Sequence, residues 1–247
     1  MTNTLGNRVE LQTITKEKDI GVTIDDNLNF DYHINNIVKK ANSLMGIIRR
    51  AFTTLDCETF PLLFKALVRP HLEYAESVWN PYLKRQIKLI EDVQRRATKW
   101  LPGMKDLAYT DRLAKLKLPT LIYRRHRGDM IEAYKILNNK YDSQLPKFLQ
   151  IYNCNYNTRG HQLKLVHQTY KTKVRENFFS NRIVNMWNDL PEDIVVSKTV
   201  DHFEKLLDKF WINQEFKFDW TAEYNPNLNN HNNLNKHNNN VPSRTSS

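Results

Sequence analysis

The sequence predicts a mainly α-helical protein: a bundle of helices preceded by a short β-hairpin and followed by a small α or α+β region and a disordered tail. Before residue 30 apolar residues alternate with polar ones, and from residue 31 they recur at three- and four-residue steps. The first period is that of a strand and the second is that of an amphipathic helix. Ten asparagines occur between residues 225 and 240, and such a segment cannot bury enough apolar surface to fold. The chain beyond Tyr224 is therefore expected to be disordered and dispensable for stability.

Two short strands are expected at the beginning of the chain, over residues 8–14 and 18–24. Residues 25–29, DDNLN, have the composition of a turn and would cap the helix that follows. Apolar stripes then predict a series of helices, most of them separated by prolines or polar residues. The helices are expected at residues 31–50, 57–69, 70–79, 83–100, 110–117, 120–140, 175–189 and 199–211, with one further strand at 161–167.

These elements group into four parts. Residues 1–30 hold the strands, residues 31–140 form a basic helical domain, residues 141–220 form a C-terminal helical region, and residues 221–247 form an asparagine-rich tail. The boundary between the two helical parts is expected within residues 141–158, because this stretch is polar and has no apolar period.

The charge of the chain is strongly positive. It carries 37 lysines and arginines against 27 aspartates and glutamates, a formal net charge of +10. Residues 31–100 and 101–140 each have five more basic than acidic side chains, and such a surface is typical of nucleic-acid binding. The alternative, which charge alone supports equally, is that these side chains only solvate helix surfaces. Aromatic residues among them could stack on bases, but Trp79 and Trp100 lie on apolar stripes, which favours a place in the core.

Six cations are the candidate nucleic-acid-binding residues, and they fall in two clusters. The first lies on one exposed turn of the helix at 83–100, in the register that buries Ile90 and Val93. The second opens the helix at 120–140, where cations oppose the helix dipole and a bound phosphate would offset the cost. We therefore expect both clusters to face one groove for the phosphate backbone. The six residues are Arg95, Arg96, Lys99, Arg124, Arg125 and Arg127.

No catalytic residue and no metal site is expected in this chain. The adjacent carboxylates Asp25-Asp26 begin a turn, and turn and capping duty outweighs a metal-binding role for them. The two cysteines are too few for a disulfide scaffold or a cysteine-built zinc site, and GxGxxG, HExxH and GxSxG patterns are missing from the sequence. No apolar run approaches the roughly 20 residues that span a membrane. An intracellular protein, cytoplasmic or nuclear, with no membrane partner is therefore expected.

Several stretches, taken in order, resemble one known protein family. The stretch KDIGVTIDDNLNFDYHINNIVKKANSLMGIIRRAF at 18–52 is similar to the segment after the polymerase palm in reverse transcriptases of jockey-like non-long-terminal-repeat retrotransposons. The thumb of these proteins is similar to two further stretches, LFKALVRPHLEYAESVWNPY at 63–82 and IKLIEDVQRRATKWLPG at 87–103. Their C-terminal tail is similar to TRGHQLKLV, ENFFSNRIVNMWNDLPEDIV and VDHFEKLLDKF. Together the resemblance covers roughly residues 8–211.

The resemblance implies a thumb-like helical domain that follows the residual end of a palm at residues 1–30. The palm strand with its Tyr/Phe-Ala-Asp-Asp motif and the endonuclease of the family have no counterpart here, so Mg²⁺ would belong to the missing palm. The chain is therefore expected to need no cofactor and not to be an enzyme by itself. Its expected function is non-catalytic binding of template–primer nucleic acid, an RNA or DNA duplex or an RNA–DNA hybrid, by backbone electrostatics. The alternative is a helical protein-interaction domain with no nucleic-acid role.

Overall fold

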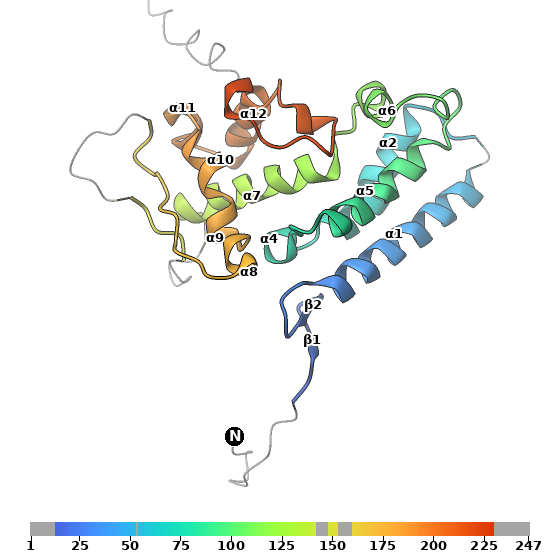
Figure 1. Cartoon of the computed structure of the whole chain (residues 1–247). Coiled ribbons are helices and arrows are strands. Elements are labelled where there is room, and N and C mark those ends of the chain that lie inside the picture. Colours follow the sequence, from blue (N-terminus) through green and yellow to red (C-terminus); the bar gives the residue numbers. More distant parts are fainter. Residues whose placement is uncertain (1–12, 53, 142–147, 153–159, 230–247) are drawn as a thin grey trace, which may run out of the picture.

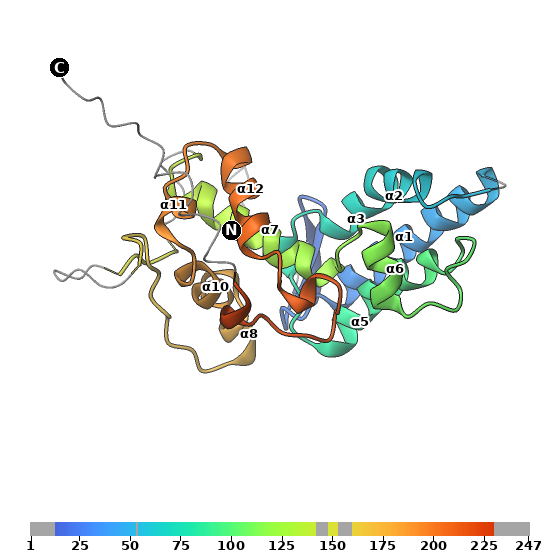
Figure 2. The same cartoon turned by 90° about the horizontal axis from the view of Figure 1, so that it is seen from above.

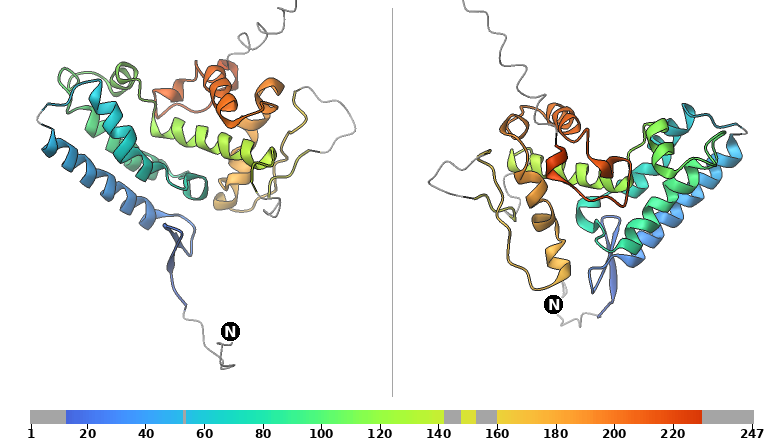
Figure 3. Two further views of the ribbon diagram at one scale, coloured as in Figure 1. Left: turned by 180° about the vertical axis from the view of Figure 1, so that it is seen from behind. Right: turned by 45° about the horizontal axis from the view of Figure 1, so that its top comes forward.

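The computed structural model describes residues 13–52, 54–141, 148–152 and 160–229. The expected fold class is confirmed, because the described chain is mainly helical and begins with one two-stranded antiparallel hairpin. Figure 1 shows two groups of helices joined by one long helix, with the hairpin at the lower edge of the first group. The view from behind in Figure 3 shows the same division.

The hairpin is formed by β1 (Lys16–Asp19) and β2 (Val22–Asp25), with the first residue of β1 opposite the last of β2. Its two-residue loop, Ile20-Gly21, has φ angles of 41° and 85°, the left-handed geometry of a tight hairpin turn. The expectation of one continuous strand over 18–24 is therefore wrong, because the glycine permits the chain to reverse inside it. The strand expected at 8–14 lies almost entirely outside the described residues.

A single carboxylate organises the turn that leads from the hairpin into α1 (Asp31–Ala51). Asp25 accepts hydrogen bonds from the backbone N–H groups of Asn27, Asn29 and Phe30, at 3.2, 3.1 and 2.7 Å. The turn role expected for this aspartate is confirmed, and its carboxylate oxygens are occupied by backbone donors.

The long helix α1 packs beside α5 (Lys84–Thr98), and the two run in the same direction. Near their beginnings the amide Nε2 of Gln86 donates to Asp31 Oδ1 at 2.7 Å. Further along, the guanidinium of Arg96 donates to Asn42 Oδ1 at 3.2 Å. These two contacts fix the register of the pair along its whole length.

Three elements form one continuous helical path: α2 (Thr59–Leu63), the π turn η1 (Phe64–Val68) and α3 (Arg69–Glu73). The π turn ends two residues before Pro70, which has no N–H to donate to the carbonyl four residues earlier, so the wider turn accommodates the proline. The helix expected at 70–79 is accordingly divided between α3 and the separate short helix α4 (Glu76–Trp79).

The first hydrophobic core lies among these helices and α6 (Tyr109–Leu116). Its largest fully buried side chain is Trp79, so the core role expected for this tryptophan is confirmed. The other buried members are Val22, Ile34, Val38, Ala41, Met45, Ile48, Leu55, Phe60, Phe64, Val68, Leu72, Ile90, Val93, Ala97, Leu101, Met104, Leu113, Leu116, Leu118 and Leu121.

The helix α7 (Leu121–Leu137) connects the two cores, as Figure 1 shows. Its first residue belongs to the first core, whereas Tyr123 and the apolar residues after it belong to the second. The hydroxyl of Thr120 caps the helix by accepting from the N–H of Tyr123 at 3.1 Å. The cores therefore divide at the start of α7 and not within residues 141–158. The sequence does not show this division, because the same apolar stripe of α7 contributes to both cores without a change of period.

The second core is built from short helices packed around α7 and α12 (Figure 2). The segment expected as one helix at 175–189 is broken into three, and the strand expected at 161–167 is reduced to a single bridge between Ile151 and Leu165. The elements are α8 (Lys173–Glu176), α9 (Phe179–Arg182), α10 (Val184–Asn188), α11 (Glu192–Val195), α12 (Val200–Phe210) and the 3₁₀ turns η2 (Glu215–Lys217) and η3 (Pro226–Leu228).

The beginning of the expected tail is part of the folded protein. Gln214 is buried, and its Nε2 donates to the carbonyl of Asn225 at 2.6 Å and to Asn229 Oδ1 at 2.8 Å. The backbone N–H of Asn225 donates back to Gln214 Oε1 at 3.1 Å. The expectation of disorder is therefore wrong for residues 225–229, while residues 230–247 lie outside the described part of the chain.

Candidate nucleic-acid interface

A groove of about 870 Å³ lies between α1 and α5, toward the C-terminal ends of both helices. Met45 and Val93 are buried at its floor, one from each helix. Gly46, which also lines the groove, adds no side chain to fill it. The amphipathic stripes that hold α1 and α5 together thus leave an open channel above their contact line.

Cations line this groove. Four exposed side chains, which we call the groove cations, are Arg49, Arg50, Arg96 and Lys99. No carboxylate is among the described residues that line the groove, and none of the groove cations forms an ion pair with a described carboxylate. Four positive charges in one groove repel one another, so the groove is a favourable place for an extended anion.

Neutral contacts hold two of the groove cations in place. The guanidinium of Arg49 lies 5.1 Å from the ring centroid of Trp100, within the range of a cation–π contact. Arg96 donates from Nε to the carbonyl of Asp92 at 3.1 Å and from Nη2 to the amide oxygen of Asn42. These contacts orient the guanidinium groups and leave their charge uncompensated.

The first of the two expected clusters is only partly in the groove. Arg96 and Lys99 line it, as an exposed turn predicts. Arg95 is half-buried and instead forms an ion pair with Asp92 at 2.5 Å, three residues earlier on the same helix. Trp100, expected in the core, packs against the first core but is only half-buried, and it also lines the groove.

The second expected cluster does not line the groove. Arg124 binds Glu73 with two hydrogen bonds, both of 3.0 Å, from Nε and Nη2. Arg127 pairs with Asp208 at 2.7 Å and with Glu204 at 2.9 Å. Both guanidinium groups are thus held by carboxylates of this protein.

Arg125 lies deeper still. Only 1% of its surface is exposed, and its Nε donates to Asn80 Oδ1 at 3.1 Å. The expectation that both clusters share one groove is therefore wrong. The physical reason is that α7 begins between the two cores, so its first turn is enclosed. Negative charge does lie beside the cations at this helix N-terminus, as expected. It comes from carboxylates of the protein itself, on α3 and α12, and not from a bound phosphate.

A buried network surrounds this turn. Arg182 donates to both oxygens of Asp129, at 2.9 and 2.7 Å, and the carboxylate of Asp129 is fully buried. Burial, followed by the nearby carboxylates of Glu73 and Asp129, raises the pKa of Glu76 to about 9. Burial lowers the pKa of His126 to about 4. At pH 7 both of these side chains are neutral, so this region concentrates polar groups without offering charge to solvent.

The groove residues that sequence reasoning missed are Arg49 and Arg50. Both lie in the last turn of α1, where cations complement the helix dipole, so their position alone does not indicate a binding role. The signal that could have found them is the pairing of α1 with α5, which brings residues 49–50 beside residues 96–100. Nothing in the local sequence of either helix encodes that pairing.

The described residues hold no group of three or more histidines, cysteines, aspartates or glutamates that could bind a metal ion. Among the helices that the structure describes, none is both long and apolar enough to cross a membrane.

Comparison with known proteins identifies a weak similarity. A protein of Caenorhabditis elegans, described only as uncharacterized, is 27% identical to this chain over 129 residues. The aligned segment is 51% of this chain and 65% of the relative, so the chain spans less than two thirds of the relative's length. No family model and no solved structure matches. This similarity assigns no function, so the proposed function rests on the surface of the protein.

Proposed function

We propose that this protein binds the phosphate backbone of double-stranded nucleic acid, an RNA or DNA duplex or an RNA–DNA hybrid, in the groove between α1 and α5. The observation that carries the proposal is a groove lined by four cations and by no described carboxylate. The resemblance of residues 18–103 to the region after the palm in jockey-like reverse transcriptases supports the same role, that of a non-catalytic C-terminal fragment of an RNA-directed DNA polymerase.

The chemistry of the groove favours binding without sequence preference. Arginine and lysine contacts to phosphate displace counterions from a duplex, and this gain does not depend on base sequence. Trp100 is half-buried and packs against the first core, so its ring is less available to stack on a base. Affinity should therefore fall steeply with salt and vary little between duplex sequences.

The test replaces the groove cations together, as Arg49→Gln, Arg50→Gln, Arg96→Gln and Lys99→Gln. We expect the variant to bind a hybrid duplex at least about tenfold more weakly at low salt, and the slope of log K against log salt to become shallower by about 0.9 per lost phosphate contact. Fluorescence anisotropy with a labelled duplex, repeated across salt concentrations and with two unrelated sequences, measures both quantities.

A matched control removes the same charge elsewhere. Four exposed lysines on the second group of helices are changed to glutamine: Lys171, Lys198, Lys205 and Lys209. This control should keep nearly the parent slope, because only long-range attraction is lost. Equal losses in the two variants would mean that net charge, and not the groove, is responsible, and an unchanged groove variant would exclude the proposal.

The alternative function, a helical protein-interaction domain, also has an observation in its favour. Leu62 and Leu67, on the path from α2 to η1, are 66% and 47% exposed. A contiguous exposed apolar patch would mark a protein-interaction site, and these two leucines are the candidates for one. This function would become the leading one if the groove variant binds duplex as the parent does.

A further inference from the structure

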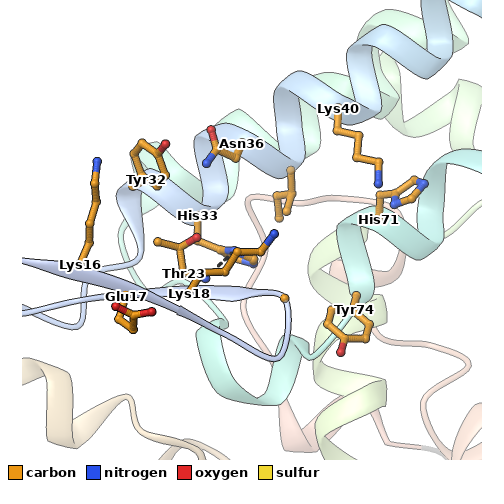
Figure 4. A pocket seen from close by; sticks show the side chains of 12 residues that line it. Lys16, Glu17, Lys18, Thr23, Tyr32, His33, Asn36, Lys40, His71 and Tyr74 are labelled. Carbon is orange, nitrogen blue, oxygen red and sulfur yellow. Dashed lines mark hydrogen bonds between the residues drawn. The ribbon is translucent and has the colours of Figure 1, made fainter.

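A second hollow lies where the hairpin meets α1 and α3, and Figure 4 shows it from close by. Its volume is about 770 Å³, within the range of small-molecule sites in proteins. Lysine ammonium groups, histidine rings and tyrosine rings line it, together with one carboxylate, that of Glu17. The hollow thus combines positive charge with flat aromatic surfaces.

The positive charge comes from both sides of the hollow. Lys18 extends from β1 and lies near His33, while Lys40 extends from α1 toward His71 (Figure 4). Within the described residues neither lysine forms an ion pair. Burial and the adjacent lysine lower the pKa of each histidine, so both imidazole rings are neutral at pH 7 and able to donate one N–H.

Hydrogen bonds between the elements hold the hollow in shape. The hydroxyl of Tyr74 donates to the carbonyl of Ile20 at 3.0 Å, which ties α3 to the hairpin loop. The backbone N–H of Thr23 donates to His33 Nδ1 at 3.3 Å, which ties β2 to α1. Because Nδ1 accepts, the neutral ring of His33 carries its proton on Nε2, and this atom has no partner among the described residues.

Tyr32 supplies the aromatic surface. It is exposed at the rim, and the ammonium of Lys16 lies 3.9 Å from its ring centroid. A planar base could stack on the part of this ring that Lys16 leaves uncovered. The phosphate, which is joined to the base through the sugar, would then reach Lys18 and Lys40.

We propose that this hollow binds a nucleoside monophosphate, either as a free nucleotide or as the unpaired end of a nucleic-acid strand. The phosphate is held by Lys18 and Lys40 and the base lies against Tyr32. The site is separate from the groove between α1 and α5: at roughly 100° per residue, Asn36 and Lys40 lie on a different side of α1 from Asn42 and Arg49. The proposal therefore does not rest on duplex binding in the groove.

The test titrates adenosine 5′-monophosphate into the full chain in a phosphate-free buffer, followed by changes in tyrosine and histidine NMR signals. The double variant Lys18→Gln, Lys40→Gln is expected to bind the nucleotide about tenfold more weakly or worse, since two charge-assisted contacts are lost. The matched control Lys205→Gln, Lys209→Gln and the four-residue groove variant are expected to bind it as the parent does. Circular dichroism checks that each variant keeps its helices.

The proposal is overturned if the parent gives no saturable signal change up to about 10 mM nucleotide, a weak limit for a specific site. It is equally overturned if the Lys18/Lys40 variant binds like the parent, or if the groove variant loses nucleotide binding. A Tyr32→Leu variant tests the base: it should weaken binding of the nucleotide and leave binding of inorganic phosphate unchanged. Equal effects on both probes would contradict the part of the proposal that concerns the nucleoside.

A final arm distinguishes the two sources of the nucleotide. Blunt duplex and duplex with an unpaired 5′-phosphorylated overhang are compared as competitors of adenosine 5′-monophosphate. Competition by the overhang alone assigns the site to strand ends, whereas competition by neither duplex assigns it to free nucleotides. Either result supports the proposal, because both place a nucleoside monophosphate in the hollow.

Discussion

Two groups of arginines in this protein have the same chemistry and opposite surroundings. Arg49, Arg50 and Arg96 line an open groove and form no ion pair with a described carboxylate. Arg124 and Arg127 lie at the start of α7 and are enclosed by Glu73, Glu204 and Asp208. The first group leaves its charge exposed to solvent, whereas the second uses its charge to join the two halves of the fold.

The difference teaches that a cluster of cations in a sequence does not reveal what it binds. Arg124 and its carboxylate partner are 51 residues apart, and Arg127 and Asp208 are 81 residues apart. Such partners become visible only once the helices are placed. Cations that form no ion pair with a described carboxylate in the folded protein, such as the groove cations, are the better candidates for binding a ligand.

The largest expected effect concerns Arg182, a third arginine that is enclosed by the protein as Arg124 and Arg127 are. Replacing Arg182 with alanine removes the guanidinium that donates two hydrogen bonds to the fully buried carboxylate of Asp129. We expect the free energy of unfolding to fall by about 3–5 kcal/mol, because the buried charge loses its ion-pair partner and retains the weaker hydrogen bond from the amide of Asn80. Urea unfolding followed by circular dichroism measures the change.

The matched change in the open group is Arg50→Ala, which removes an exposed guanidinium with no ion-pair partner among the described residues. Its stability should stay within about 0.5 kcal/mol of the parent. If the two variants lose similar stability, the distinction between enclosed and open arginines is not valid.

A smaller effect is expected at the C-terminal end. Ending the chain after Tyr224 removes the partners of Gln214, namely the carbonyl of Asn225 and the amide of Asn229, and leaves a buried amide unsatisfied. The loss should be about 1–3 kcal/mol. Ending the chain after Asn229 keeps these bonds, so its thermal midpoint should equal that of the parent. A truncation after Tyr224 that unfolds at the parent's midpoint would show that this polar closure does not stabilise the fold.

The third effect is a pH dependence. The pKa of Glu76 is about 9 in the folded protein, whereas its ordinary value is 4.5. Between these two pH values the folded state binds a proton that the unfolded state has released. Stability from this group is complete below pH 4.5 and falls as the pH rises toward 9. Between pH 7 and 9, where histidines no longer titrate, the decline is at most about 1.4 kcal/mol per pH unit.

The variant Glu76→Gln tests this assignment. It retains the shape of the side chain without an ionisable proton, so its stability should be nearly constant between pH 7 and 9. Denaturant midpoints at three pH values are sufficient to compare the slopes. A parent and a variant with parallel slopes would assign the pH dependence to a different group.

The helices with a long apolar period were predictable from the sequence. The expected ranges for α1, α5 and α12 agree with the structure within a few residues, because each buries one continuous stripe. Short elements were not predictable in this way. The segment at 175–189 has enough apolar residues for one helix, but its backbone is broken by two turns that no proline or glycine marks.

The candidate site was predictable only in part. Arg96 and Lys99 follow from the period of α5 alone, since the register that buries Val93 exposes them. Arg49 required knowledge that α1 lies beside α5, which depends on contacts between residues more than 40 positions apart. The burial of Arg125 required knowledge that α7 starts between two cores.

The cap of α7 has a consequence for the order in which the protein folds during synthesis. The hydroxyl and the N–H of Thr120 donate to the carbonyls of Phe216 and Lys217, at 2.6 and 2.9 Å. Phe216 leaves the ribosome 96 residues after the threonine, and Lys217 follows it directly. Because N-terminal segments generally fold first during synthesis, we expect α1 to α6 to assemble before these bonds form. The anchorage of Thr120 to the C-terminal half is therefore completed only after nearly the whole described chain has emerged.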